Sequence, residues 1–168
     1  MKRGLYIGRF QPYHNGHRSV IEHIADEVDE LIIGIGSAEF SHDIRHPFTA
    51  GERVLMISRS LNDISIPVYI IPLEDVMRNA LWVSHVKSMT PPFDIVYSSN
   101  PLVIELFREA GIPVASPPMF CREILSGIAV RTRMISDDAW EEYVPCEVVD
   151  VIREIHGIER IQQIAKTD

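Results

Sequence analysis

The chain is poor in cysteine and in long apolar stretches, and each shortage excludes a class of protein. Its 168 residues include two cysteines, Cys121 and Cys146, whose spacing fits neither a metal site nor a disulfide framework. We therefore expect buried or incidental thiols in a reducing compartment, and with them a cytoplasmic protein. No run approaches the roughly 18 apolar residues of a membrane helix, and the N-terminal apolar stretch is too short for a signal peptide.

Positive charge is also in short supply. The chain has 16 Lys and Arg residues against 24 Asp and Glu residues, which gives a formal net charge of −8. This balance argues against a nucleic-acid partner, because a phosphate backbone favours a basic protein face. It does not exclude a small anionic ligand, because a local cluster of arginine and histidine can oppose the overall sign.

The sequence has no internal repeat, low-complexity tract or linker, and its length suits one domain, residues 1–168, with a substantial core. Short apolar runs of strand type alternate with helical patterns along the chain. We expect strands at residues 3–9, 30–37, 68–73, 94–100 and 112–118. We expect helices at 16–29, 49–61, 79–89, 100–111, 126–137, 138–144 and 145–166, the last with a break near Gly157, and a loop at 38–48.

This alternation predicts an α/β fold, a Rossmann-like doubly wound parallel sheet of about five strands with a helical C-terminal region. Two helices carry clear start signals. Thr49 is followed three residues later by Glu52, which is a capping box, and Asn100 is an N-cap before a proline. The apolar face of the helix at 49–61 is expected from Val54, Leu55, Ile57 and Leu61.

The stretch "GRFQPYHNGH", residues 8–17, directly follows the first expected strand. In doubly wound folds, ligands bind at the carboxyl ends of strands where the strand order reverses. Its glycines permit a close backbone approach, and the helix that begins near Gly16 presents free N–H groups to an anion. Together with the side chains of Arg9, His14 and His17, these groups predict a phosphate site. The alternative is a plain strand-to-helix turn with a capping Asn15 and solvated histidines.

The same stretch resembles the His-x-Gly-His signature of the nucleotidyltransferase superfamily, which lies between the first strand and the first helix. That superfamily has a second signature, Ser/Gly-Thr-x-Ile/Val-Arg, at the start of a later helix, and "SGIAVR", residues 126–131, stands there. Over "GIGSAEFSHDIRHPFTAGER" and "NALWVSHVKSMTPPFDIVYSSNP" the chain is similar to the archaeal nicotinamide-mononucleotide (NMN) adenylyltransferases. The likeness covers nearly the whole chain.

The resemblance implies transfer of AMP from ATP to NMN, which gives NAD and pyrophosphate. The attacking group would be a phosphate oxygen that is already anionic, so no general base is needed, and the sequence has no paired carboxylates or Ser/His/Asp order to suggest one. The protein then has to hold two polyanions in line and neutralise developing charge. We expect Mg²⁺ to arrive with ATP and no separate metal site.

The resemblance also implies roles for particular residues. Catalytic roles fall to His14, His17, Arg9, Arg45 and Arg131. ATP binding falls to Gly8, Arg9, Phe10, His14, Gly16, His17, Asn100, Ser126, Ile128, Val130 and Arg131. NMN binding falls to Ser37, Arg45, Asn79 and Trp82, with Trp82 against the nicotinamide ring and Asn79 near its carboxamide.

Some of these positions have structural alternatives. Trp82 could be a core residue, and Arg45 and Arg131 could be surface arginines. We expect His42, His46 and Arg133 to be solvated and Trp140 to pack in the core. Ile128 stands where the signature has threonine, and Ser99 where we expect glycine. Ile128 either leaves the triphosphate one hydroxyl short or turns into the core, with Ser126 supplying the hydroxyl instead.

Three other functions remain open from sequence. The first is AMP transfer to another phosphorylated acceptor, such as phosphopantetheine or a riboflavin phosphate, which Arg45, Asn79 and Trp82 argue against. The second is a nucleotide-sensing module without turnover, supported by Ile128 alone. The third is a class I synthetase fragment, which the net charge and the lack of a tRNA-binding extension oppose. The family resemblance implies a homo-oligomer, often a hexamer.

Overall fold

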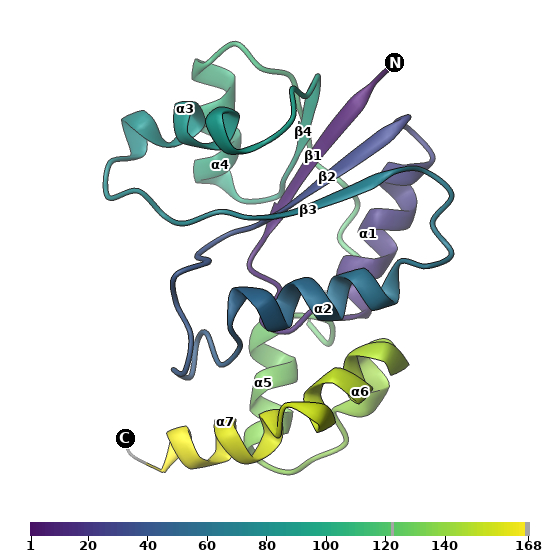
Figure 1. Ribbon diagram of the computed structural model, residues 1–168, viewed down its shortest axis with the longest axis vertical. Coiled ribbons are helices and arrows are strands. Elements are labelled where there is room, and N and C mark those ends of the chain that lie inside the picture. The colour runs from purple at the N-terminus through teal and green to yellow at the C-terminus, as the bar shows by residue number, and fades with distance from the viewer. Residues whose placement is uncertain (122, 167–168) are drawn as a thin grey trace.

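The computed structural model describes residues 1–121 and 123–166. Within them the centre of the fold is a five-stranded, wholly parallel sheet in the order β3-β2-β1-β4-β5 (Figure 1). The strands are β1 Arg3–Gly8, β2 Glu30–Ile35, β3 Val68–Pro72, β4 Ile95–Tyr97 and β5 Val114–Ala115. The chain runs outward from β1 through β2 to β3 and then returns to the other side of β1 for β4. The expected α/β class is therefore confirmed, with its switch point between β1 and β4.

The helices lie close to where the sequence predicts them. They are α1 Asn15–Ala25, α2 Ala50–Ser60, α3 Asn79–Met89, α4 Pro101–Glu109, α5 Gly127–Ile135, α6 Cys146–Glu154 and α7 Gly157–Ala165. The Thr49 capping box is confirmed, because the Thr49 hydroxyl accepts from the Glu52 N–H while the Glu52 carboxylate accepts from the Thr49 N–H. Asn100 caps α4 as expected, with its Oδ1 2.9 Å from the Leu102 N–H.

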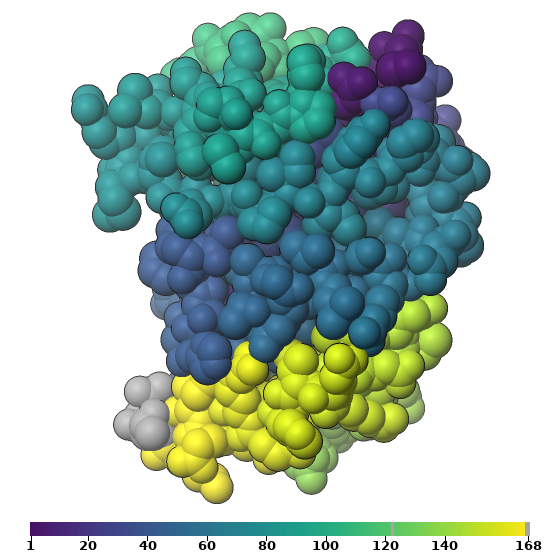
Figure 2. Space-filling view, in the orientation of Figure 1, coloured from purple at the N-terminus to yellow at the C-terminus, as the bar shows by residue number. Residues whose placement is uncertain are grey.

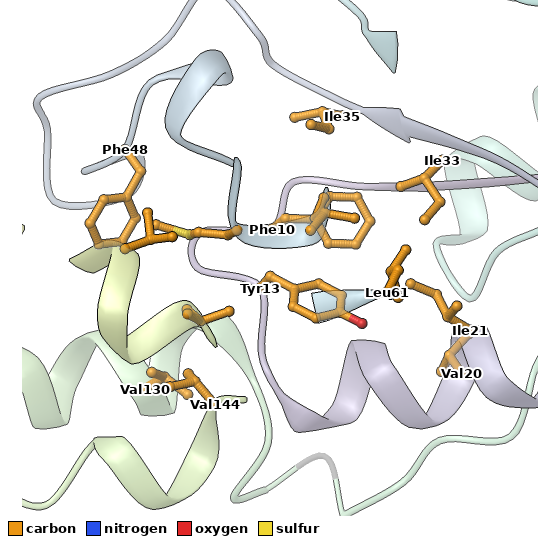
Figure 3. Close-up of a cluster of buried hydrophobic side chains, with 14 of the residues drawn as sticks. Phe10, Tyr13, Val20, Ile21, Ile33, Ile35, Phe48, Leu61, Val130 and Val144 are labelled. Atoms are coloured by element: carbon orange, nitrogen blue, oxygen red, sulfur yellow. The ribbon is translucent and has the colours of Figure 1, made fainter. Parts of the chain in front are cut away.

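Alternate residues of β1 point to opposite faces of the sheet, so the sheet has two apolar layers. Leu5 belongs to the core under α3 and α4, and Tyr6 belongs to the larger core that includes residues of α1, α2 and the C-terminal helices. Figure 3 shows part of this larger core, in which Phe10 and Tyr13 lie among side chains such as Phe48 and Val130. The loop after β1 is therefore anchored by its own aromatic residues, which fixes the polar groups that lie between them.

The C-terminal region is helical, but one expected helix is wrong. Residues 138–144 contain a single 3₁₀ turn, η1 Glu141–Tyr143. The segment is short, it follows Asp137 in the left-handed region (φ 54°), and Pro145 stops it. Trp140 packs in the core as expected, with 4% of its surface exposed.

The predicted break in the last helix is confirmed one residue before Gly157. His156 takes φ 54° and separates α6 from α7. A Cβ on Gly157 would lie 2.9 Å from the Phe48 ring, so the glycine lets α7 approach the loop before α2. Figure 2 shows the same arrangement from outside, with the yellow C-terminal helices against the blue α2 segment. Within residues 1–121 and 123–166, no helix is long and apolar enough to cross a bilayer.

Candidate active site

A cavity of about 630 Å³ opens at the carboxyl edge of the sheet, over the switch point between β1 and β4. Its walls include residues 6–11 at the end of β1 and just after it, Gly36 and Ser37 after β2, residues 98–100 after β4, and the first turns of α1 and α5. Every predicted site residue lines this cavity except Asn79 and Val130. Val130 is fully buried in the core, and Asn79 is exposed at the start of α3. The fold thus brings together residues that are more than a hundred positions apart in the sequence.

His14 and His17 cap α1 reciprocally, so the plain-turn alternative with a capping Asn15 and solvated histidines is wrong. The His14 Nδ1 accepts from the backbone N–H groups of Gly16 and His17, at 3.1 and 3.3 Å, and the His17 Nδ1 accepts from the His14 N–H at 3.1 Å. The two rings stack with their centroids 3.6 Å apart. The helix therefore begins at Asn15, with His14 as its N-cap.

This capping arrangement assigns the imidazole tautomers. A ring nitrogen that accepts an N–H hydrogen bond carries no proton, so each neutral ring must carry its proton on Nε2. The Nε2 nitrogens are thus N–H donors, and both side chains line the cavity. Neither histidine presents a free lone pair to a ligand, which makes them donors to anionic oxygens and not nucleophiles.

Both histidines are held in the neutral form. Desolvation, together with a smaller contribution from the nearby Arg131 charge, lowers the pKa of His14 to about 4. Desolvation and the neighbouring His14 lower the pKa of His17 well below its usual range. The Phe10 and Tyr13 rings pack on His17, with centroids 4.7 and 5.8 Å away, and shield part of its ring from water.

The depressed pKa of His14 predicts a stability cost at acidic pH in the ligand-free protein. As pH falls below about 6.5, the unfolded chain takes up a proton that folded His14 refuses until about pH 4. Stability is therefore complete above pH 6.5 and decreases toward pH 4, by about 2 kcal/mol for this group between pH 7.5 and 5. Denaturant unfolding at fixed protein concentration measures it. His14→Asn, which keeps a strong N-cap but does not titrate, should lose correspondingly less, and equal losses would contradict the assignment.

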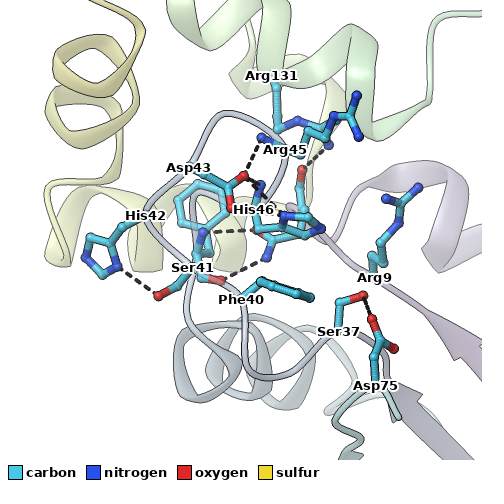
Figure 4. Close-up of polar contacts among 12 residues, drawn as sticks. Arg9, Ser37, Phe40, Ser41, His42, Asp43, Arg45, His46, Asp75 and Arg131 are labelled. Carbon is cyan, nitrogen blue, oxygen red and sulfur yellow. Dashed lines mark hydrogen bonds and ion pairs between the residues drawn. The ribbon is translucent and has the colours of Figure 1, made fainter. Parts of the chain in front are cut away.

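Three arginines face the same cavity. Arg131 on α5 donates from Nη1 to the Gln11 carbonyl oxygen at 2.8 Å, and Arg9 and Arg45 are exposed to the cavity (Figure 4). Desolvation lowers the pKa of Arg131, the charges of Arg9 and Arg45 lower it further, and Asp43 acts in the opposite direction. Such a repulsive cluster of cations is stabilised when a polyanion binds between them.

The loop at 38–48 has no helix or strand, as expected, but it is ordered by Asp43. The Asp43 Oδ1 accepts from the backbone N–H groups of Arg45 and His46, at 2.8 and 2.7 Å. The His46 ring lies 3.1 Å from the same oxygen and stacks on Phe40, so His46 is partly buried and the expectation that it is solvated is wrong. These contacts hold the backbone of Arg45 at the cavity mouth.

One end of the cavity suits an aromatic ligand. Trp82 on α3 is half-buried, lines the cavity, and packs edge-to-face on Phe107 with centroids 5.6 Å apart. Both the core interpretation and the binding interpretation of Trp82 thus have support in its contacts. Nearby, the Ser37 hydroxyl donates to the Asp75 carboxylate at 2.7 Å, and both residues line the cavity.

The second motif opens α5 at the cavity wall. The Ser126 hydroxyl accepts from the Ala129 N–H at 3.1 Å, and a Cβ on Gly127 would lie 2.7 Å from the Arg131 Nη1. A side chain at 127 would therefore require the end of the Arg131 side chain to shift from its position over the helix start. Ile128 is 72% exposed and lines the cavity, so the interpretation that it packs in the core is wrong.

Ile128→Thr is consequently expected to add a hydroxyl donor without disturbing the core. One additional hydrogen bond to a charged phosphate is worth about 1.5–3 kcal/mol, which would tighten ATP binding roughly tenfold or more. Calorimetric titration with ATP and Mg²⁺ measures the gain, while NMN affinity and the thermal melt should not change. An unchanged ATP affinity would mean that the phosphates already have enough hydrogen-bond donors at this helix start.

Sequence reasoning missed Gln11 and Arg53. The Gln11 side chain is buried and pairs with both backbone groups of Phe48, at 2.9 and 3.0 Å. Arg53 is fully buried on α2 and, within the part of the chain that the structure describes, donates only to backbone carbonyl oxygens. Gln11 lies in the quoted stretch 8–17 but outside its His-x-Gly-His motif, and Arg53 lies in a helical pattern, where a polar residue is ordinarily assigned to the solvent face. Only the three-dimensional arrangement identifies them.

Metal ligation by the protein has no support in this geometry. Among residues 1–121 and 123–166, no group of three or more His, Cys, Asp or Glu side chains is placed to hold a metal ion. The cavity instead offers N–H donors and guanidinium groups, which bind anionic oxygens.

The parallel sheet, the switch-point cavity and its cationic lining define an α/β protein whose cavity, at the start of α1 and α5, is suited to anionic groups. The chain belongs to the cytidylyltransferase-like family, whose model matches residues 5–133. It is similar over its full length to proteins named nicotinamide-nucleotide adenylyltransferase from Methanocorpusculum labreanum and Methanoculleus marisnigri, at 74% and 64% identity, with 100% of each chain covered. The protein of that name from Haloarcula marismortui is 57% identical over 99% of this chain and 88% of its own.

Solved structures share the fold. A bifunctional NMN adenylyltransferase/ADP ribose pyrophosphatase from Francisella tularensis, complexed with AMP and a Mn ion, superposes with a TM-score of 0.77 at 20% identity over 96% of this chain. The chain spans about half of that protein, 52% of its length. A putative nicotinate-nucleotide adenylyltransferase from Vibrio parahaemolyticus has a TM-score of 0.65 at 17% identity, covering 90% of this chain and 99% of its own.

Proposed function

We propose that this chain is a nicotinamide-nucleotide adenylyltransferase, which transfers AMP from ATP to NMN and releases pyrophosphate to make NAD. The observation that carries the proposal is the convergence of two neutral histidine donors and three arginines in one cavity at the carboxyl edge of the sheet. The names of its full-length relatives support the same activity.

The residues act on the triphosphate by binding and by charge neutralisation. The Nε2–H groups of His14 and His17 and the free N–H groups at the start of α1 bind oxygens of the triphosphate. Arg131 neutralises charge on the leaving pyrophosphate, and Arg9 lies against the same phosphates. Gly8, Gly16 and Gly127 permit the close approach. The remaining ATP contacts are assigned to Phe10, Asn100, Ser126, Ile128 and Val130, the last through its backbone because its side chain is buried.

The acceptor occupies the opposite end of the cavity. Trp82 stacks on the nicotinamide ring, and a cationic pyridinium over an indole is favourable. Arg45 binds the NMN phosphate where it meets the α-phosphate, with Ser37 beside it, and Asn79 reaches the carboxamide from the rim. Positioning two reactants in this way, with donors preset for the developing charge, supplies the rate enhancement without a general base.

Mg²⁺ enters as part of the MgATP substrate. It prefers phosphate oxygens and water to an all-protein cage, which agrees with a cavity lined by donors and cations. We assign no step to the metal. On the family resemblance we also propose a cytoplasmic homo-oligomer, with a hexamer as the expected assembly. Analytical ultracentrifugation measures its size.

The direct test incubates the protein with ATP, Mg²⁺ and one acceptor at a time, and measures pyrophosphate release. We expect release with NMN and formation of NAD, and none with phosphopantetheine or riboflavin phosphate. Release with another acceptor alone would overturn the choice of NMN and with it the role of Trp82. ATP binding without release under any acceptor would favour the nucleotide-sensing module.

A further inference from the structure

Arg53 is a buried cation whose bonds all go to the main chain. Its side chain is fully buried in the first turn of α2. Nη1 donates to the carbonyl oxygens of Arg9 and Gly36, each at 2.9 Å. Nη2 and Nε donate to the carbonyl oxygens of Ser37, Phe40 and Thr49, at 3.2, 3.5 and 3.2 Å respectively. Within residues 1–121 and 123–166 it makes no ion pair with a carboxylate.

Burying a charged guanidinium costs desolvation free energy, which a residue that serves only packing would not have to spend. Desolvation lowers the pKa of Arg53 to about 10, partly offset by the charges of Glu39 and Glu52, so the guanidinium stays protonated at neutral pH. The same buried face of α2 carries Met56 and Ile57, so an apolar residue suits the position. A guanidinium differs from these neighbours in offering five donors in one fixed plane, which can bind several carbonyl groups at once.

The carbonyl groups belong to segments that build the cavity. Arg9 follows β1, Gly36 and Ser37 follow β2, and all three line the cavity, Arg9 on the side proposed for ATP and Ser37 on the side proposed for NMN. Phe40 and Thr49 flank the loop that carries Arg45. One planar group therefore links the main chain on the ATP side to the main chain on the acceptor side.

We propose that Arg53 is a positioning residue, which fixes the loop after β1 relative to the loop after β2 and so sets the separation of the two reacting phosphates. The proposal rests on the proposed function for its kinetic consequence, but its structural part does not depend on the identity of the substrates. It differs from a packing role, because packing on α2 can be weakened at Met56 without releasing any of the five carbonyl groups.

The test compares Arg53→Lys and Arg53→Gln with Met56→Ala, a buried control on the same face of α2. Assays are run well below the melting temperature of every variant. A misplacement of about 1 Å between reactants costs on the order of a hundredfold in rate, so we expect the Arg53 variants to lose about that factor in kcat with small changes in both KM values. Met56→Ala should keep kcat within a few-fold even where it melts at a lower temperature. If one of the two Arg53 variants does not fold, the other still provides the comparison of kcat with Met56→Ala.

Hydrogen exchange supplies the readout that does not need turnover. The amides of residues 36–41 should exchange faster in the Arg53 variants than in the parent protein and in Met56→Ala. Unchanged exchange in this segment, or a kcat loss no larger than that of Met56→Ala, would overturn the proposal. If the parent protein makes no NAD, the proposed function fails, and the exchange data alone decide whether Arg53 positions the loops.

Discussion

His17→Asn should lower kcat by about a hundredfold or more while the protein stays folded. The Asn side-chain oxygen can still accept from the His14 N–H, as the His17 Nδ1 does at 3.1 Å, so the start of α1 keeps its cap. What is lost is the Nε2–H donor that faces the cavity. Removing one preset donor from a site where charge develops costs about 10²–10³ in kcat. Steady-state kinetics with saturating ATP and NMN measures the loss.

His17→Gln is the matched control. Its amide nitrogen reaches farther, toward the position of Nε2, but its oxygen no longer lies where Nδ1 accepts from His14. We expect this variant to melt at a lower temperature than His17→Asn and yet to retain more kcat. If His17→Asn, or the simpler His17→Ala, keeps the parent kcat, His17 is only a capping residue.

Trp82→Ala should weaken NMN binding by roughly thirtyfold and leave ATP binding within about threefold. Stacking of a cationic ring on a desolvated indole is worth about 2 kcal/mol, which corresponds to that factor. The variant also loses the edge-to-face contact with Phe107, so a lower melting temperature is expected in addition. Separate calorimetric titrations with NMN and with ATP measure the two affinities.

The control for this loss is Trp82→Phe, which keeps an aromatic face toward the cavity. It should recover a large part of the NMN affinity while the melting temperature recovers only partly. Equal loss of affinity for both substrates, or a loss of stability alone, would mean that Trp82 serves the core through Phe107 and that NMN has lost its principal binding residue.

The fold was predictable because each local signal agrees with the arrangement of the whole chain. The Thr49 capping box and the Asn100 cap appear where the sequence places them. The switch-point rule then predicted the position of the cavity, since the stretch after β1 could only lie at the carboxyl edge of the sheet. The helix predicted at residues 138–144 was wrong because a short segment with one buried tryptophan has no periodicity that distinguishes a helix from a 3₁₀ turn.

The roles of side chains within the site were harder to predict from the sequence. The sequence could identify His14 and His17 as donors but not their tautomers, which depend on backbone N–H groups brought close by the helix start. The apolar face expected for α2 begins at Val54 and does not include Arg53. In the structure the buried residues of this helix are Arg53, Met56, Ile57 and Ser60. An arginine in that stripe is stable only because three segments of main chain present their carbonyl groups to it, and no local pattern encodes that.

In the proposed reaction, AMP passes directly from ATP to the acceptor phosphate, with the histidines as donors. The stereochemistry at phosphorus tests it. The substrate is a single diastereomer of ATP in which sulfur replaces one non-bridging oxygen of the α-phosphate. After reaction with NMN and Mg²⁺, phosphorus NMR of the dinucleotide product gives the configuration at the transferred phosphorus. A single in-line displacement predicts inversion. Retention would show two displacements through a covalent AMP-protein intermediate, and would contradict the tautomers assigned to His14 and His17, which leave no lone pair free to attack.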